Sequence, residues 1–297
     1  MIDYKKIVRS REIRVKISNF LKFIPDRFYL RMVYYLKTGK RLNLKNPKGF
    51  NEKLNWLKLN DIHSEYTKLV DKYEVRSVIK DKLGDGYMFP LLGVWNSYDE
   101  IDFSSLPNQF VLKCTHDSGS VRIVLDRSGI NHKEFNSFYK SRLRINSYNL
   151  GREYPYKNVK PRIIAEELMG NGDSPNDYKF FCFDGKPVIM FIATERSSGN
   201  TKFDFYDMNF SHLDIVNIHP QSDKGEIAKP RCFEEMKLIA KTCSRGMKFV
   251  RIDLYEINGK VYFGEYTFFH GGGFYLFKPD SYELKLGELI KIDSSGI

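Results

Sequence analysis

A mixed α+β fold is predicted by two patterns that occupy different parts of the chain. Up to about residue 85 the apolar residues recur at helical spacing, whereas from Tyr87 onward short runs of β-branched and aromatic residues indicate strands. The chain has 297 residues, 42% hydrophobic and 15% aromatic, so it can bury a core and is not expected to be disordered. These patterns divide it into a helical segment over 1–85 and two α+β subdomains, a small one over 86–165 and a larger one over 166–297.

The helical segment is amphipathic and begins with a strongly basic stretch. Within residues 11–40 apolar side chains are interleaved with Lys and Arg, and Pro25 separates two helices. Residues 1–48 hold 14 Lys and Arg against 3 Asp and Glu, a net charge of +11 that equals that of the whole chain. This charge suits an anionic membrane surface, contacted through residues 1–45, or an acidic polymer; a solvated helical face is the simpler alternative. Because no nucleic-acid recognition motif accompanies the charge, we expect no nucleic-acid partner.

Two more helices are predicted before the first strand. One is capped near Asn51, and the other extends from Tyr66 to Leu83, where Gly84 provides a C-terminal signal. The predicted strands 110–114 and 121–125 then enclose a compact turn at 116–120, preceded by Lys113. Such a turn can present backbone N–H groups to phosphate oxygens beside a lysine, although a Ser-Gly turn is also ordinary hairpin structure.

The later strands form hairpins. Residues 161–169 predict an apolar strand that contains two adjacent glutamates, and residues 177–194 predict a hairpin that 201–206 continue. The alternating stretches 249–255 and 261–268 predict a last hairpin around Asn258 and Gly259.

The loop of that last hairpin decides where its carboxylates lie. A two-residue turn would put Glu265 on the face opposite Asp253, whereas a three-residue loop centred near Gly259, with a bulge, would pair the two residues directly. Directly opposed carboxylates repel each other unless a cation lies between them, and oxygen ligands without His or Cys favour Mg²⁺. The alternative is a hairpin whose polar face is only solvated.

The sequence favours a cytoplasmic protein. It has no run of about 18 apolar residues that would span a membrane, and its first residues lack the apolar core of a signal peptide. The four cysteines have neither paired nor metal-like spacing, which is typical of free thiols in a reducing compartment. The basic N-terminal stretch adds the expectation of a peripheral position at the inner face of the membrane.

Taken in order, these motifs resemble the ATP-grasp superfamily, and within it the branch named for the teichuronopeptide biosynthesis protein TupA. The resemblance extends from about Asn46 to the last helix and depends on the order and spacing of five short motifs: Asp71-Lys72, Lys113 with its loop, Glu166-Glu167-Leu168, Arg251-Ile-Asp253 and Glu265-x-Thr267. It implies an ATP-grasp fold, in which two α+β subdomains grip ATP.

The resemblance also implies which residues bind the nucleotide. Lys72 and Lys113 would hold the α- and β-phosphates, and the loop would close over the γ-phosphate through His116, Ser118, Gly119 and Ser120. Backbone groups of Glu166, Glu167 and Leu168 would read the adenine edge. Asp177 would accept hydrogen bonds from the ribose, and Lys202 would face a phosphate.

For the chemistry, the resemblance implies a metal set and two catalytic residues. Asp253, Glu265 and Thr267 would hold Mg²⁺, or Mn²⁺, between the phosphates, and Arg251 would stabilise the transferred phosphoryl group. His270 would act as a base for an attacking amine or would order the glycine-rich loop that it begins. Thr267 stands where many relatives carry Asn, and the phosphate loop holds one glycine where relatives have several.

The function implied is an ATP-dependent carboxylate–amine ligase that forms an amide through an acyl phosphate. Its partners would be ATP, an acidic surface polysaccharide such as a capsule or its sugar precursor, and an amino acid or another amine. The alternatives are a kinase or glycosyltransferase of the same pathway, and a non-catalytic polysaccharide- or membrane-binding protein on a degenerate ATP-grasp fold.

Overall fold

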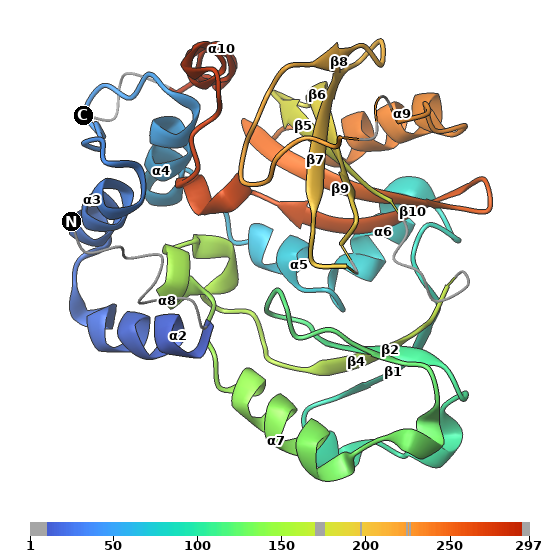
Figure 1. Cartoon of the computed structure of the whole chain (residues 1–297). Helices are drawn as coiled ribbons and strands as arrows, with labels where there is room; N and C mark the ends of the chain where they lie inside the picture. The colour runs from blue at the N-terminus through green and yellow to red at the C-terminus, as the bar shows by residue number, and fades with distance from the viewer. Residues whose placement is uncertain (1–10, 170–175, 197, 224, 226, 293–297) are drawn as a thin grey trace.

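The computed structural model describes residues 11–169, 176–196, 198–223, 225 and 227–292. It confirms the mixed α+β fold, with two antiparallel sheets and helices packed around them (Figure 1). The small sheet has the order β1-β4-β2-β3 and the large sheet the order β10-β9-β5-β6-β7-β8. The strands of the small sheet are β1 (Leu91–Trp95), β2 (Phe110–Cys114), β3 (Arg122–Val124) and β4 (Ile163–Glu167). Those of the large sheet are β5 (Asp177–Phe183), β6 (Lys186–Thr194), β7 (Lys202–Asp207), β8 (His212–Leu213), β9 (Phe249–Ile257) and β10 (Lys260–Thr267).

The small sheet buries one face and turns the other toward two short helices. Helix α7 (His132–Leu143) covers the buried face, where Tyr139 is fully buried and donates its hydroxyl to the Leu112 carbonyl at 3.0 Å. The opposite face carries Lys113 and Glu166, which alternate with the core residues of β2 and β4. This polar face lies toward α5 (Tyr66–Val70) and α6 (Val75–Leu83), which pass between the two sheets (Figure 1).

The two faces of the large sheet differ: one is apolar, and the other, called the functional face below, carries buried charged residues. Helix α9 (Phe233–Ser244) packs on the apolar face, with the Phe233 ring 6.1 Å from that of Phe180. Because side chains alternate along a strand, Lys179, Arg251 and Asp253 all point to the other face. That face is therefore the place in the large sheet where charged groups converge.

Two helices close the end of the functional face. Helices α4 (Phe50–Asn60) and α10 (Asp280–Leu289) contact each other, and the fully buried Phe50 ring lies 5.0 Å from that of Phe249. The Glu283 carboxylate accepts the Asn51 backbone N–H at 2.6 Å and so satisfies an N–H of the first turn of α4. Short segments complete this region: α8 (Tyr148–Gly151), η5 (Tyr154–Tyr156) and η6 (His270–Gly273), where η marks a 3₁₀ helix.

The basic N-terminal stretch forms the predicted pair of helices. Helix α2 (Arg11–Phe20) runs into η1 (Leu21–Phe23), and α3 (Asp26–Thr38) begins directly after Pro25. Leu30 and Val33 of α3 pack with Leu42 and Phe274 in a small separate core. Within the described ranges, no helix combines the length and hydropathy needed to cross a bilayer.

The single helix predicted over Tyr66–Leu83 is wrong, because the chain breaks at Asp71. Asp71 is extended, with ψ of 116°, and its Oδ1 accepts the backbone N–H groups of Tyr73 and Glu74 at 2.8 and 3.2 Å, which caps α6. The break frees the Lys72 backbone N–H to donate to the Thr115 carbonyl at 3.1 Å. It therefore places Lys72 beside the loop at 116–120.

The last hairpin pairs Asp253 with Glu265, but through the two-residue turn and not the three-residue loop, the two alternatives that the sequence left open. The turn has two residues, Asn258 and Gly259, both with positive φ (54° and 73°), as a type I′ turn requires. The extra residue is Gly264, a β-bulge within β10 that shifts the register by one position. The bulge, and not the loop, brings the two carboxylates to the same face.

Gly264 is required at the bulge, and replacing it should destabilise the fold. A Cβ there would lie 2.9 Å from both the Asp253 carbonyl oxygen and the Tyr255 ring. We expect Gly264→Ala to cost about 1–3 kcal/mol of unfolding free energy, measured by urea denaturation, because neither the strand nor the ring can move away freely. Gly129→Ala is the matched control, since its nearest neighbour would be 3.9 Å away. Equal stability of the two variants would show that the bulge tolerates a side chain.

Candidate active site

The centre of the functional face is a buried group of alternating charges. Arg251 makes a two-pronged contact with Asp253, from Nε to Oδ1 and from Nη2 to Oδ2, each at 2.7 Å. Lys179 of β5 lies between Asp253, to which it donates a hydrogen bond, and Asp177, at 2.6 Å. Arg196 Nη1 contacts the same oxygen of Asp177, Oδ2, at 2.7 Å. Each carboxylate is thus held between two cations.

Burial and charge act in opposite directions on these carboxylates. Burial alone would raise the pKa of Asp253, but Arg251 and Lys179 together hold it below its ordinary value, so the group stays ionised. For Asp177 burial prevails over Lys179 and Arg196 and raises the pKa. Asp177, predicted to bind ribose, is 1% exposed; both cations contact its Oδ2, and its buried Oδ1 has no hydrogen-bond partner among the described residues.

Asp253, Glu265 and Thr267 form an oxygen-rich set around Arg251. Glu265 Oε1 lies 3.8 Å from Arg251 Nη2, and the Thr267 hydroxyl accepts from the same nitrogen at 3.0 Å. Glu265 is 37% exposed, so one side of the set is open, whereas Asp253 is fully buried. Two carboxylates and a hydroxyl on adjoining strands suit Mg²⁺, which keeps several waters and takes few protein ligands. The set holds only two carboxylates, and no group of three or more His, Cys, Asp or Glu placed to hold a metal ion occurs in the described part of the chain.

His270 orients Arg251 in this structure and is not placed as a base. Arg251 Nη1 donates to His270 Nδ1 at 2.7 Å, so the proton resides on Nε2, which donates to Asn217 Oδ1 at 2.8 Å. Burial, and then the charge of Arg251, lower the pKa of His270 well below its ordinary value. Both nitrogens are engaged and the ring is 1% exposed, so the predicted role in ordering its surroundings fits better than that of a base for an amine.

A buried lysine, Lys58, holds the glycine-rich loop after His270 through hydrogen bonds to the backbone. Gly271, Gly272 and Gly273 all have positive φ (57°, 65° and 69°). Lys58 of α4 is 3% exposed and donates to the Gly272 carbonyl at 2.6 Å and the Gly151 carbonyl at 2.8 Å. Burial lowers the pKa of Lys58 to about 7. The loop thus has a rigid backbone beside Arg251.

The two predicted phosphate lysines lie at the small sheet, Lys113 on β2 and Lys72 between α5 and α6, where it contacts the loop at 116–120. Lys113 Nζ contacts Glu166 Oε2 at 2.5 Å, and Arg76 contacts the other oxygen at 3.0 Å. Lys72 Nζ donates to the Asp117 carbonyl at 2.6 Å. Glu166 is therefore a counterion for two cations at the polar face of the sheet, in addition to its predicted place beside adenine.

The rest of the predicted adenine segment lies at the end of β4. Glu167 is exposed, and its backbone N–H already donates to the Pro90 carbonyl at 3.0 Å. Leu168 is partly buried, and the residues after Met169 lie outside the described ranges up to Asn176. The adenine contact stays a prediction.

Only the tip of the predicted phosphate loop is exposed. His116 and Ser120 are almost fully buried: His116 Nε2 contacts the Arg142 carbonyl at 3.1 Å, and the Ser120 hydroxyl accepts from Cys114 N at 3.0 Å and donates to Asp117. Ser118 and Gly119 are exposed, and Gly119 has a φ of 84°. The buried side chains of His116 and Ser120 fix the two ends of the loop. The backbone of Ser118 and Gly119 is the part that stays accessible.

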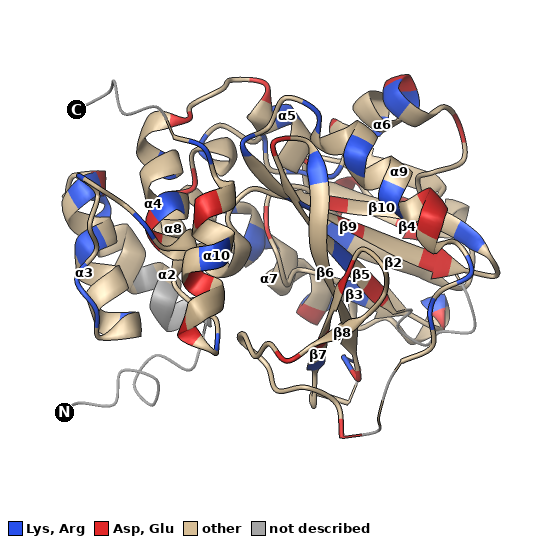
Figure 2. Cartoon of the chain, turned by 90° about the horizontal axis from the view of Figure 1, so that it is seen from above, with Lys and Arg blue, Asp and Glu red and all other residues tan. Residues whose placement is uncertain are grey.

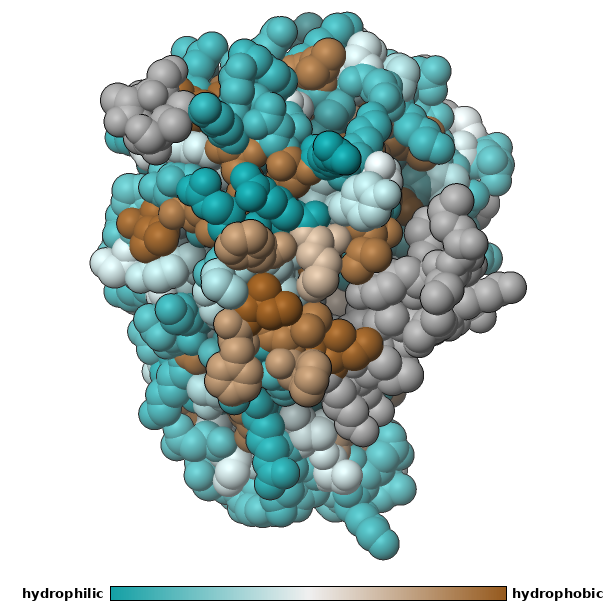
Figure 3. All heavy atoms as spheres, turned by 90° about the vertical axis from the view of Figure 1, so that its left-hand side faces the viewer, coloured by the Kyte–Doolittle hydropathy of each residue, from teal (hydrophilic) through white to brown (hydrophobic). Residues whose placement is uncertain are grey.

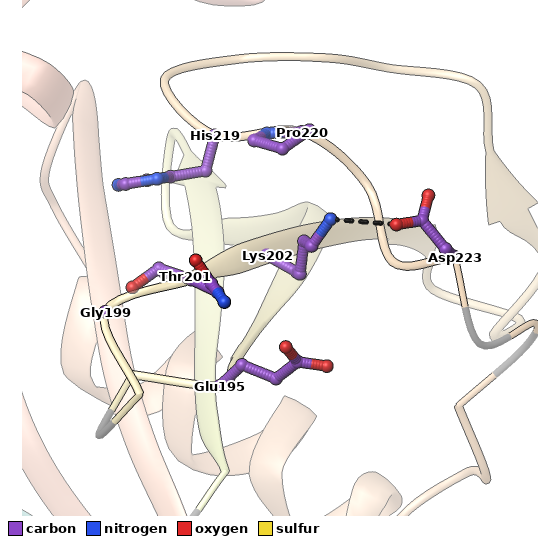
Figure 4. Close-up of a pocket in the computed structure, with 8 residues that line it drawn as sticks. Glu195, Gly199, Thr201, Lys202, His219, Pro220 and Asp223 are labelled. Atoms are coloured by element: carbon purple, nitrogen blue, oxygen red, sulfur yellow. Dashed lines mark hydrogen bonds and ion pairs between the residues drawn. The ribbon is translucent and has the colours of Figure 1, made fainter.

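Lys202 lies apart from the Asp253 group, in a pocket at the end of β7. Strands β5 and β6 separate β7 from β9, and Lys202 Nζ contacts Asp223 at 3.1 Å. Figure 4 shows Lys202 directed toward Asp223, with Glu195 and His219 across the opening. The pocket has a volume of about 540 Å³ and is lined by Glu195, Gly199, Asn200, Thr201, Lys202, His219, Pro220 and Asp223.

Sequence reasoning missed several residues that the structure brings to the site, notably Lys58, Lys179, Arg196 and Asn217. One signal for Lys179 was available, because a lysine within an otherwise apolar strand is rarely buried without an anionic partner. Asn217 and Arg196 lie in irregular segments, where no local pattern marks them.

Comparisons with known proteins found one matching family and several similar solved structures. The family model for TupA-like ATPgrasp proteins matches residues 52–291. Similar solved structures include D-alanine–D-alanine ligase from Bacillus anthracis complexed with ATP (13% identity, 67% of this chain, 53% of that chain, TM-score 0.39). D-alanine–D-alanine ligase from Helicobacter pylori has 15% identity, 75% of this chain and 61% of that chain covered, and a TM-score of 0.40. L-amino acid ligase from Bacillus licheniformis has 12% identity, 84% of this chain and 57% of that chain covered, and a TM-score of 0.44.

The chain spans less than two thirds of the length of these ligases. No curated protein matches it. The family match covers most of the chain and both sheets, from α4 to α10. The chain therefore belongs to the TupA-like ATP-grasp family.

Proposed function

We propose that the protein is an ATP-dependent carboxylate–amine ligase. The observation that carries the proposal is the pairing of Asp253 with Glu265 on one face of the large sheet, with Arg251 bridging Asp253, Thr267 and His270. This arrangement would provide a carboxylate pair for a metal ion, with a cation fixed beside it. ATP would lie between the two sheets, with Lys72 and Lys113 on the side of the small sheet.

The proposed chemistry has two steps. An oxygen of the substrate carboxylate attacks the γ-phosphorus of ATP, and ADP leaves, which gives an acyl phosphate. An amine then attacks the acyl carbon, inorganic phosphate leaves with the electrons of the C–O bond, and the proton lost by the amine goes to this phosphate. Mg²⁺, held by Asp253 and Glu265, would neutralise phosphate charge. Arg251, kept in place by Asp253 and His270, would stabilise the charge on the transferred phosphoryl group.

The other site residues would position the substrates and exclude water. The Ser118–Gly119 tip would cover the phosphates, and its braced flanks keep its backbone oriented. Lys58 holds η6, whose glycines would permit close approach of the acyl group. Water exclusion matters because an acyl phosphate would otherwise be hydrolysed.

We infer that the acceptor is anionic. The basic N-terminal helices favour an acidic substrate such as a uronic acid of a surface polysaccharide or its sugar precursor, joined to an amino acid or another amine. The enzyme would work in the cytoplasm, where ATP and activated sugars are present.

The proposal is tested first by nucleotide binding. We expect ATP with Mg²⁺ to raise the melting temperature, because a ligand at about 100 times its dissociation constant stabilises by about 2.7 kcal/mol. ATP without Mg²⁺ should give a smaller shift. Phosphate release is then measured with glucuronic acid and a panel of amino acids. A folded protein that gives no shift with MgATP would overturn the proposal.

A further inference from the structure

We propose that an exposed aromatic face on the N-terminal helices docks the protein on an anionic membrane surface. The aromatic face comprises Phe20, Phe23, Phe28, Met32, Tyr35 and Leu36, on α2, η1 and α3. This inference goes beyond the proposed ligase activity and does not depend on it. Residues 11–51 also lie outside the stretch that the family model matches.

The exposure of this face is unusual for a protein surface. Phe20, Phe23 and Phe28 are 82%, 83% and 62% exposed, although phenylalanine is among the residues most often buried. Their neighbours Leu21 and Ile24 pack against the small N-terminal core. Figure 3 shows apolar side chains gathered in one patch on this side of the molecule. A contiguous apolar patch marks an interaction site, whereas single exposed residues do not.

The pattern along α3 shows that the exposure is built into the sequence. Phe28, Met32, Tyr35 and Leu36 recur at the spacing of one helical face, and all are exposed. The adjoining residues Tyr29, Leu30, Val33 and Tyr34 form a second apolar face, which is buried. The helix therefore has more apolar surface than its own core needs, and the surplus faces outward.

Charge identifies the partner. The exposed cations Lys22, Arg27 and Arg31 flank the aromatic face, and Lys and Arg recur along α3 (Figure 2). Residues 11–41 hold nine Lys and Arg against two acidic residues. Aromatic and aliphatic side chains bordered by cations are typical of helices that lie in the headgroup region of anionic bilayers. A second copy of this chain fits less well, because two basic faces would repel each other.

The test is sedimentation of the full chain with vesicles. Vesicles of phosphatidylglycerol and phosphatidylcholine in equal parts are compared with phosphatidylcholine alone. The variant is Phe20→Ser with Phe23→Ser, since both side chains project from the surface and the fold should survive. The matched control is Leu238→Ser with Leu284→Ser, two apolar residues that are 65% and 53% exposed on α9 and α10. Melting temperatures verify that all the variants are folded.

We expect the wild type and the control to sediment with the anionic vesicles only, and less so as salt is raised. The Phe20/Phe23 variant should bind more than about tenfold more weakly, because each inserted Phe contributes the free energy of burying its ring. A wild type that stays in solution with anionic vesicles overturns the proposal, as does a variant that binds like the wild type. A dimer that the variant dissociates, without vesicle binding, would assign the face to a second copy of the chain.

Discussion

Glu265→Gln should reduce Mg²⁺-dependent ATP turnover by at least about 10²-fold, because one of the two carboxylates that would hold the cation loses its charge. The fold should be unaffected, since Glu265 is 37% exposed and its closest charged contact, with Arg251, is 3.8 Å long. Phosphate release at saturating ATP measures the loss, and the Mg²⁺-dependent shift in melting temperature should shrink in parallel.

Asp253, the carboxylate paired with Glu265, needs a milder substitution than alanine. Asp253→Ala would leave Lys179 and Arg251 buried without their shared counterion, which costs about 3–5 kcal/mol and confuses loss of activity with unfolding. Asp253→Asn keeps the shape and is the better test. Glu256→Gln is the matched control, because Glu256 lies on the same hairpin with its side chain on the opposite face. Full turnover by Glu265→Gln, or an equal loss in Glu256→Gln, would contradict the metal assignment.

Arg251→Lys is expected to lower kcat by about 10³-fold or more, with a much smaller effect on the KM for ATP. The planar guanidinium reaches Asp253 twice, His270 and Thr267 at the same time, at 2.7–3.0 Å. A lysine has one ammonium group and cannot reproduce this geometry. Steady-state phosphate release gives both constants, and Arg245→Lys, an exposed arginine just after α9, serves as the control. A kcat within a few-fold of the wild type would show that Arg251 is only structural.

The pH dependence of kcat distinguishes a positioning role of His270 from a role as catalytic base. Its pKa lies well below 6.5 in the folded protein, so the imidazole is neutral throughout the neutral range. We expect His270→Gln to lower kcat at every pH and to leave the shape of the pH–rate profile unchanged. If the wild type instead shows an inflection between about pH 6 and 8 that the variant lacks, His270 is the base after all.

Local patterns in the sequence predict most of the elements that carry the site. Alternation along 249–255 and 261–268 predicts two strands and the face of Asp253, and Pro25 predicts the break between the first two helices. These signals suffice because strand periodicity and proline sterics act over a few residues. They are weaker where a side chain interrupts an element, as Asp71 does by capping α6.

Tertiary structure decided the rest, because the deciding contacts join residues far apart in the chain. The register that opposes Asp253 to Glu265 depends on a bulge at Gly264 that lies against Asp253 and Tyr255 of the neighbouring strand.

Lys179 meets Asp253 only because β5 lies beside β9, and His270 is held in place by Arg251 and by Asn217, 53 residues away. The sequence alone determined the fold class and most of the strands, and it predicted which carboxylates would hold a metal. Their register, burial and partners were set by long-range packing, which no local pattern encodes.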